Sequence, residues 1–245
     1  MKKIFFSALL FVSTACFSQY SELLLAAAER GDVGSQFHIG TAFFQGQGVA
    51  QNDAKALQWF RRAAEQGLAE AQYNVGQMLQ KGRGAAQDNA EAVQWFRRAA
   101  EQGLAVAQYD LGVNFAEGLG VAQNDAEAVR WFRRAADQGS VKAQYNLGLM
   151  IDKGRGGKQG DVEAVQWFRR AAEQGLAEAQ FLLGIHLSAG RGVSKNYEQA
   201  YFWLLLAGAH LEKSRDARDL VQRHLSSSQV TETQSRAAAW KPKQP

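Results

Sequence analysis

Four histidines are the side chains of this sequence best suited to bind a metal or to move a proton: His38, His186, His210 and His224. None of them stands in the H-E-x-x-H spacing that places two zinc ligands on one helix face. The sequence also contains no Gly-x-Ser-x-Gly turn and no Ser-x-x-Lys pair, the signatures of two groups of serine hydrolases. We therefore expect no metal site, no cofactor and no catalytic residue, and predict that the protein is not an enzyme.

Glycine pairs of the form Gly-x-Gly recur along the chain and look like fragments of a phosphate-binding loop. They begin at Gly46, Gly82, Gly118, Gly154 and Gly190. None extends to G-x-x-x-x-G-K-[ST], and no β-strand pattern precedes any of them. We interpret the pairs as turns, in which glycine supplies the positive φ angles that other residues avoid.

The composition favours helices. The 245 residues are 46% hydrophobic, which is enough for a sizeable core, and β-branched residues are sparse. The formal net charge of +4 is too small to indicate a nucleic-acid-binding protein. The apolar stretch Phe202–Leu211 is too short to span a membrane, so we expect a buried helix there and no membrane-spanning segment.

Residues 1–18 have the pattern of a signal peptide. Two lysines precede the apolar run Ile4–Val12, and small residues follow it. We expect cleavage after Ser18 and a periplasmic or secreted protein. The alternative is a lipoprotein cut before Cys16, although a serine stands where that signal needs an aliphatic residue. Cleavage after Ser18 removes the only cysteine, so no disulfide is expected.

The chain repeats itself every 36 residues. One marker of the repeat is a tryptophan column: Trp59, Trp95, Trp131, Trp167 and Trp203. A glycine column keeps the same step: Gly40, Gly76, Gly112, Gly148 and Gly184. Five copies in one register therefore fill residues 33–212.

Each copy is expected to form two helices. In the second copy, apolar residues spaced four apart predict a first helix over Ala69–Lys81. A wider apolar stripe predicts a second helix over Asn89–Gln102, with Asp88 or Asn89 as its N-cap. Such a pair cannot bury its own apolar faces, so neighbouring copies must stack. The predicted fold is all-α: a right-handed α-solenoid superhelix of two-helix, 36-residue repeats with helical caps.

The repeated pattern A-x-x-x-L-G followed by G-x-G-V-x-x-D-x-x-x-A-x-x-W-x-x-x-A-A-x-x-G resembles the Sel-one-like repeat, a relative of the tetratricopeptide repeat. Ala107–Gly112 with Gly118–Gly139 carries the pattern well, and the resemblance covers five units. The fourth loop departs from it at Gly156-Gly157-Lys158, and three leucines replace Phe-Arg-Arg in the last unit. The resemblance implies a scaffold for protein assembly and, as in many bacterial members, a secreted or periplasmic location.

The segments outside the repeats are expected to close the two ends of the solenoid. We predict an N-terminal capping helix, two C-terminal capping helices and a disordered tail, at residues 19–32, 213–240 and 241–245. Four residues are expected to cover the apolar last repeat: Leu220, Val221, Leu225 and Trp240.

Columns that are identical in all copies are expected to serve stacking. We interpret the tryptophans as core residues. A glutamine column is interpreted as side chains that bind helix or loop backbone: Gln36, Gln72, Gln108, Gln144 and Gln180. The second helices carry arginine pairs such as Arg61-Arg62, which we expect to form ion pairs with acidic residues such as Glu65 on the same helix. The alternative for these arginines is attraction to peptidoglycan or another anionic envelope surface.

Variable positions of the first helices are expected to bind a partner, because stacking does not constrain them. They recur at one helical face and change from polar to apolar toward the C-terminus. We call this set the first-helix face: Glu70, Asn74, Gln77, Lys81, Asp110, Val113, Glu117, Asn146, Leu149, Lys153, Leu182 and Ile185. In this repeat class the first helices line the concave surface, so an extended segment or helix of another protein is expected to dock there.

The sequence thus predicts a non-enzymatic interaction scaffold, exported to the cell envelope, that binds a partner protein in its concave groove. One alternative is a β-lactam-binding or peptidoglycan-binding hydrolase, because some cysteine-rich relatives are described as binding or hydrolysing β-lactams. The lack of disulfide cysteines and of a Ser-x-x-Lys pair counts against it. A secreted virulence factor that interacts with a host is the other alternative.

Overall fold

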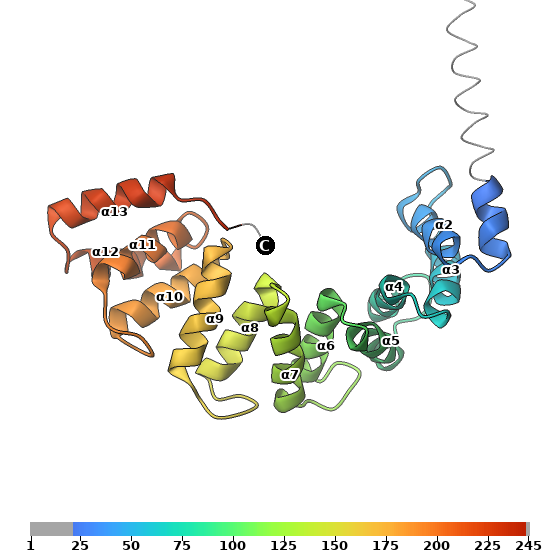
Figure 1. Cartoon of the computed structure of the whole chain (residues 1–245), viewed down its shortest axis with the longest axis horizontal. Coiled ribbons are helices and arrows are strands. Elements are labelled where there is room, and N and C mark those ends of the chain that lie inside the picture. The colour runs from blue at the N-terminus through green and yellow to red at the C-terminus, as the bar shows by residue number, and fades with distance from the viewer. Residues whose placement is uncertain (1–21, 244–245) are drawn as a thin grey trace, which may run out of the picture. The chain divides into compact units, whose positions relative to one another are not determined.

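The computed structural model describes residues 22–243, which form helices joined by turns and loops, with no β-strand in that range (Figure 1). The predicted signal peptide, its cleavage site and Cys16 lie outside the described residues. The described residues comprise a short helical segment before the repeats, the five repeats and the C-terminal helices.

The chain divides into two compact units, with the boundary between Leu104 and Ala105. In the first unit, residues 22–29 are helical and lead into α2 (Val33–Gln45), α3 (Asp53–Glu65), α4 (Ala69–Gln80) and α5 (Asn89–Glu101). In the second unit the helices are α6 (Ala105–Glu117), α7 (Asp125–Asp137), α8 (Val141–Asp152), α9 (Asp161–Glu173), α10 (Ala177–Ala189), α11 (Tyr197–Gly208), α12 (Lys213–Gln222) and α13 (Ser227–Ala239). Within each unit, successive repeat helices pack against one another, which confirms the predicted all-α repeat solenoid.

The predicted helix boundaries hold to within one residue in the second copy, where α4 ends at Gln80 and α5 ends at Glu101. Helix α5 begins after Asp88, whose carboxylate accepts a hydrogen bond from the N–H of Glu91 at 2.8 Å. Such a cap contributes about 1 kcal/mol to helix stability. The fourth copy has Gly160 at the N-cap of α9, where no side chain makes this bond.

The glycines of the Gly-x-Gly pairs are in turns, as predicted. Gly84 shows why no larger residue fits. Its φ is +80°, and a Cβ atom at this position would overlap the backbone carbonyl of Asp53, the first residue of α3.

The glycine column inside the first helices makes room for a ring of the following helix. A Cβ atom on Gly76 would lie 2.7 Å from ring carbons of Phe96, closer than carbon atoms pack. The tryptophan column is largely core, as predicted: Trp95 and Trp131 are 8% and 3% exposed. Trp59, in the first copy, is half-buried.

The glutamine column binds backbone, as predicted. Gln72 donates to the carbonyl oxygen of Ala64 at the end of the preceding helix, at 3.1 Å. Its own side-chain oxygen accepts from Gln102, a residue 30 positions further on, at 2.8 Å. We call each such glutamine pair a rung. The rungs join Gln36 to Gln66, Gln72 to Gln102, Gln108 to Gln138 and Gln144 to Gln174.

The arginine pairs of the second helices contact different groups from those expected. Arg61 forms its ion pair with Glu91, at the start of the next second helix, at 2.8 Å, and not with Glu65. The following arginine of each pair stacks on the tryptophan three residues before it, as Arg98 does on Trp95 with 4.6 Å from the guanidinium carbon to the ring centroid. Arg61 and Arg133 are therefore bound to a glutamate of the next second helix, and the second arginine of each pair lies on a tryptophan.

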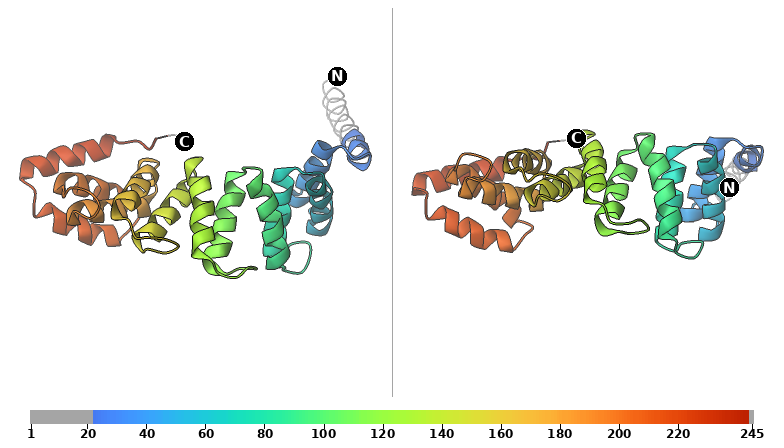
Figure 2. Two further views of the ribbon diagram at one scale, coloured as in Figure 1. Left: turned by 60° about the horizontal axis from the view of Figure 1, so that its bottom comes forward. Right: turned by 90° about the horizontal axis from the view of Figure 1, so that it is seen from below.

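Helices α12 and α13 both pack against α11 (Figure 2). Val221 is buried, and the ring of Trp240 meets the ring of Trp203 edge-on with centroids 6.1 Å apart. Leu220 was expected to cover the last repeat, but it is 58% exposed. Adjacent residues point about 100° apart on a helix, so burying Val221 turns Leu220 toward solvent.

Three residues of the tail expected to be disordered, 241–243, are described. The backbone N–H of Lys243 donates to the carbonyl oxygen of Glu173 at 2.8 Å, and its ammonium lies 2.8 Å from the carboxylate of the same residue. Residues 244–245 lie outside the described part of the chain.

Candidate partner-binding surface

Three residues of the first-helix face line a cavity of about 200 Å³ in the first unit: Asn74 and Gln77 of α4, and Lys81, the C-cap that follows it. The remaining walls come from α2, α3, α4 and the loop after α4, and the residues are Phe44, Phe60, Tyr73, Met78 and Arg83. Aromatic and thioether side chains give the cavity an apolar lining, while Lys81 is exposed. We call this space the first cavity.

Arg83 is held in the first cavity by two kinds of contact. Its guanidinium donates two hydrogen bonds to the carboxylate of Asp53, at 2.9 and 2.7 Å. The guanidinium carbon also lies 4.0 Å from the ring centroid of Phe44. The hydrogen bonds from Arg83 hold the pKa of the Asp53 carboxyl below its usual value. The Arg83 side chain is thus held in place in the cavity lining, while the Lys81 side chain is exposed to solvent.

Five residues of the first-helix face line a cavity of about 160 Å³ in the second unit: Val113, Glu117, Asn146, Leu149 and Lys153. The other residues around it are Ala116, Phe132, Met150 and Arg155. Here the first helices α6 and α8 supply the walls and α7 supplies Phe132. We call this space the second cavity.

Arg155 repeats the geometry of Arg83. It donates to the two carboxylate oxygens of Asp125 at 3.0 and 2.6 Å, and to the carbonyl oxygen of Ala116 at 3.2 Å. Its hydrogen bonds lower the pKa of the Asp125 carboxyl. Lys153 is exposed and Glu117, also exposed, comes from the other first helix, so the second cavity has groups of both charges among its lining residues.

The two cavities occupy the same place in the repeat. Seven lining positions of the first cavity recur in the second cavity 72 residues later, which is two repeat lengths: 44 and 116, 60 and 132, 74 and 146, 77 and 149, 78 and 150, 81 and 153, 83 and 155. In the copy between them, Asp110, Glu117 and Leu119 stand where the cavities have asparagine, lysine and arginine. The lysine and the arginine therefore occur together in the second and fourth copies, while the fifth copy keeps only the arginine, Arg191.

The other predicted residues of the first-helix face lie outside both cavities. Glu70 is exposed on α4 and Asp110 is half-buried on α6. Leu182 and Ile185 are half-buried on α10. The structure thus brings eight of the twelve predicted residues to two cavities and leaves these four on neighbouring helix surface.

Sequence reasoning missed the arginines Arg83 and Arg155 and the aromatic residues behind them. A signal for the arginines was present, because Lys-Gly-Arg-Gly follows the first helix in the second and fourth copies only. An aspartate stands 30 residues before each arginine. The rings of Phe60 and Phe132 were not separable by sequence from other core phenylalanines.

The four histidines are dispersed over α2, α10 and the C-terminal part of the chain. His186 is buried, with Nδ1 3.2 Å from the carbonyl oxygen of Arg191 and Nε2 3.4 Å from the carboxylate of Asp152. Ser188 on the same helix donates to a backbone carbonyl. Between residues 22 and 243, no three histidine, cysteine or acidic side chains are grouped to hold a metal ion. Within the same range, every helix is too short or too polar to cross a membrane.

Comparison with known proteins adds a family. The Sel1 repeat model matches five consecutive segments: residues 33–68, 69–104, 105–140, 141–176 and 177–210. A Sel1 repeat protein from Oxalobacter formigenes is 34% identical in sequence, with 83% of this chain and 85% of that chain covered and a TM-score of 0.73. A protective antigen of uropathogenic Escherichia coli strains, displaying an SLR fold, is 29% identical over 89% of this chain and 55% of its own, with a TM-score of 0.59. Comparison with curated proteins finds no match.

Proposed function

Because the chain belongs to the Sel1 repeat family, whose members are generally scaffolds for protein interactions, we propose that it binds an extended segment of another protein at the first-helix face. The observation that carries the proposal is the pair of equivalent cavities, each lined by both apolar and polar residues and each with an exposed lysine. No chemistry beyond binding is assigned to these groups, so the proposed role is that of a non-enzymatic adaptor.

Each cavity has the size of one large side chain. Volumes of about 200 and 160 Å³ suit a leucine, methionine or phenylalanine of the partner, which buries its apolar surface on Phe60 or Phe132. Lys81 and Lys153 beside the cavities favour a carboxylate close to that anchor in the partner segment. The proposed recognition element is therefore an apolar residue with an acidic neighbour, which docks once in each unit.

The proposal includes export to the cell envelope, on the strength of the basic and apolar pattern of residues 1–18. Mass spectrometry of the protein recovered from the envelope or medium is expected to find an N-terminus at Gln19. A chain that keeps Met1, or one that begins at a lipid-modified Cys16, would contradict cleavage after Ser18.

Site-specific photo-crosslinking in the native cell tests the binding face. A benzophenone amino acid at Gln77 or at Leu149, inside the first and second cavities, is expected to trap the same partner protein. Gln94 and Gln166 are matched controls, because both are exposed glutamines on second helices. Equal crosslinking from the controls, or crosslinking from the controls alone, would refute the assignment of the face.

A further inference from the structure

Two of the four glutamine rungs show how this fold satisfies one particular pair of oxygen atoms. In the first rung, the side-chain NH₂ of Gln66 donates to the carbonyl oxygen of Gly31 at 3.0 Å and to Oε1 of Gln36 at 2.8 Å. In the fourth rung, one NH₂ again serves two acceptors: Gln174 donates to Gly139 at 3.4 Å and to Gln144 at 2.9 Å. A single primary carboxamide thus bridges both oxygens in each case.

The last copy keeps both acceptors but loses the donor. The repeat places Gly175 and Gln180 where the acceptors should be, and puts His210 in the position of the donor glutamine. The next residue is Leu211, which cannot readily adopt the positive φ of the equivalent Gly175, +94°. Among residues 22–243, no donor is found for the carbonyl oxygen of Gly175 or for Oε1 of Gln180. The Gln180 side chain is 2% exposed, and its NH₂ donates a hydrogen bond to the carbonyl oxygen of Ala172 at 3.2 Å.

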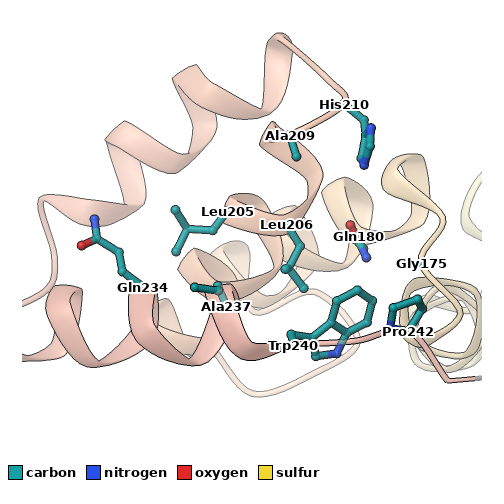
Figure 3. A pocket seen from close by; sticks show the side chains of 11 residues that line it. Gly175, Gln180, Leu205, Leu206, Ala209, His210, Gln234, Ala237, Trp240 and Pro242 are labelled. Atoms are coloured by element: carbon teal, nitrogen blue, oxygen red, sulfur yellow. The ribbon is translucent and has the colours of Figure 1, made fainter.

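Gly175, Gln180 and His210 all line a cavity of about 500 Å³ in the second unit (Figure 3). The other side is apolar and comes from α11 and the C-terminal end of the chain, with Leu206 beside the rings of Trp240 and Pro242 in the close-up. No acidic side chain is among the described residues that line this cavity. We call it the C-terminal cavity.

We propose that the C-terminal cavity binds a primary carboxamide on an apolar stem, supplied by a glutamine side chain of a partner protein. The NH₂ of the ligand takes the place that Gln66 and Gln174 hold in their rungs, donating to Gly175 and Gln180. A carboxylate has no hydrogen to give and is repelled by the two oxygens. An ammonium would lose its hydration beside Leu206 and Trp240 with no carboxylate to replace it. This site is separate from the first and second cavities and does not depend on the function proposed for them.

A pair of isosteric peptides tests the proposal on the full chain. The probes are acetyl-Leu-Gln-Leu N-methylamide and the same peptide with glutamate in the centre, titrated by calorimetry and by ¹⁵N-edited NMR. The N-methyl cap removes any other primary amide. The glutamine peptide is expected to bind at least about tenfold more tightly, because the glutamate peptide leaves the two oxygens unpaired. Free L-glutamine, as a third probe, distinguishes a small molecule from a protein segment: tighter binding of glutamine than of the peptide would overturn the protein source.

A cavity-filling variant locates the binding. Ala209→Trp fills the C-terminal cavity from an exposed position, and Ala239→Trp is the control on an exposed position of α13 outside it. Ala209→Trp is expected to abolish binding of the glutamine peptide, and Ala239→Trp to leave it unchanged. Equal binding of the two peptides, no binding of either, or unchanged binding by Ala209→Trp would overturn the proposal. If Ala209→Trp lowers the melting temperature, the proposal is judged only by comparing the affinities of the parent chain for the glutamine and glutamate peptides.

Discussion

Replacing Gln144 by leucine is expected to destabilise the second unit, because the side chain is buried and fully engaged. It is 4% exposed, donates to the carbonyl oxygen of Ala136 at 3.2 Å and accepts from Gln174 at 2.9 Å. Ala136 keeps a second bond, from the N–H of Gly139 at 3.0 Å, so its carbonyl is not left unpaired. Gln174 retains only its longer contact of 3.4 Å to Gly139. Two lost hydrogen bonds and one poorly paired, half-buried donor amount to about 2–3 kcal/mol of unfolding free energy.

Urea unfolding of the full chain, followed by circular dichroism, measures this cost. The midpoint is expected to fall with an unchanged slope, because the variant exposes the same surface on unfolding. Gln166→Leu on the exposed face of α9 is the matched control. The double variant with Gln174→Leu is expected to cost about 1 kcal/mol less than the sum of the two single variants, because both remove the same rung.

Two results would refute the reasoning about Gln144. One is a destabilisation no larger than that of the control Gln166→Leu. The other is strict additivity of the Gln144 and Gln174 substitutions, which would mean that the rung contributes nothing as a pair.

Three further predictions concern binding, packing and acid stability. Lys81→Glu with Lys153→Glu is expected to abolish capture of the crosslinked partner at an unchanged melting temperature, because both side chains are exposed. Gly76→Ala is expected to cost about 1–3 kcal/mol in urea unfolding, because its methyl group overlaps the Phe96 ring. Asp125 has a folded pKa below its usual 3.8, so the unfolded chain binds the proton first and stability falls as the pH drops through and below that value. Asp125→Asn is expected to flatten this part of the stability profile in acid titration.

Each of these has an outcome that contradicts it. If the double lysine variant still captures the partner, Lys81 and Lys153 do not contribute to binding. A more stable Gly76→Ala would show that helix propensity, about 1 kcal/mol in favour of alanine, outweighs the crowded ring. An Asp125→Asn profile that parallels the parent chain below pH 3.8 would show that its ion pair does not link protonation to folding.

The fold of the repeats was predictable because one period controls every element from α2 to α11. The columns through Trp95 and Gln72 recur at 36 residues, and each column has one structural task. Their burial and backbone contacts were inferred correctly, since every copy must make the same contacts to stack. The binding role of the first-helix face stays a prediction, although most of its residues line the two cavities.

Contacts between copies were harder to read from the sequence. Arg61 was assigned to Glu65 by intrahelical spacing, but it pairs with Glu91, because stacking brings the next second helix alongside. The orientation of α12 was also missed. Its adjacent apolar residues Leu220 and Val221 fit two different faces, and only packing against α11 selects Val221.

Three tryptophans have nearly identical surroundings, so each can serve as a fluorescence probe for the unfolding of its own repeat. Trp95, Trp131 and Trp167 each donate an indole N–H to a glutamate one turn earlier and lie beneath an arginine. Their fluorescence spectra should therefore nearly coincide while the protein is intact. In a variant that retains one of them, with phenylalanine at the other tryptophan positions, the fluorescence during heating would report the unfolding of a single repeat. Comparison of such variants would show which helical hairpin unfolds first.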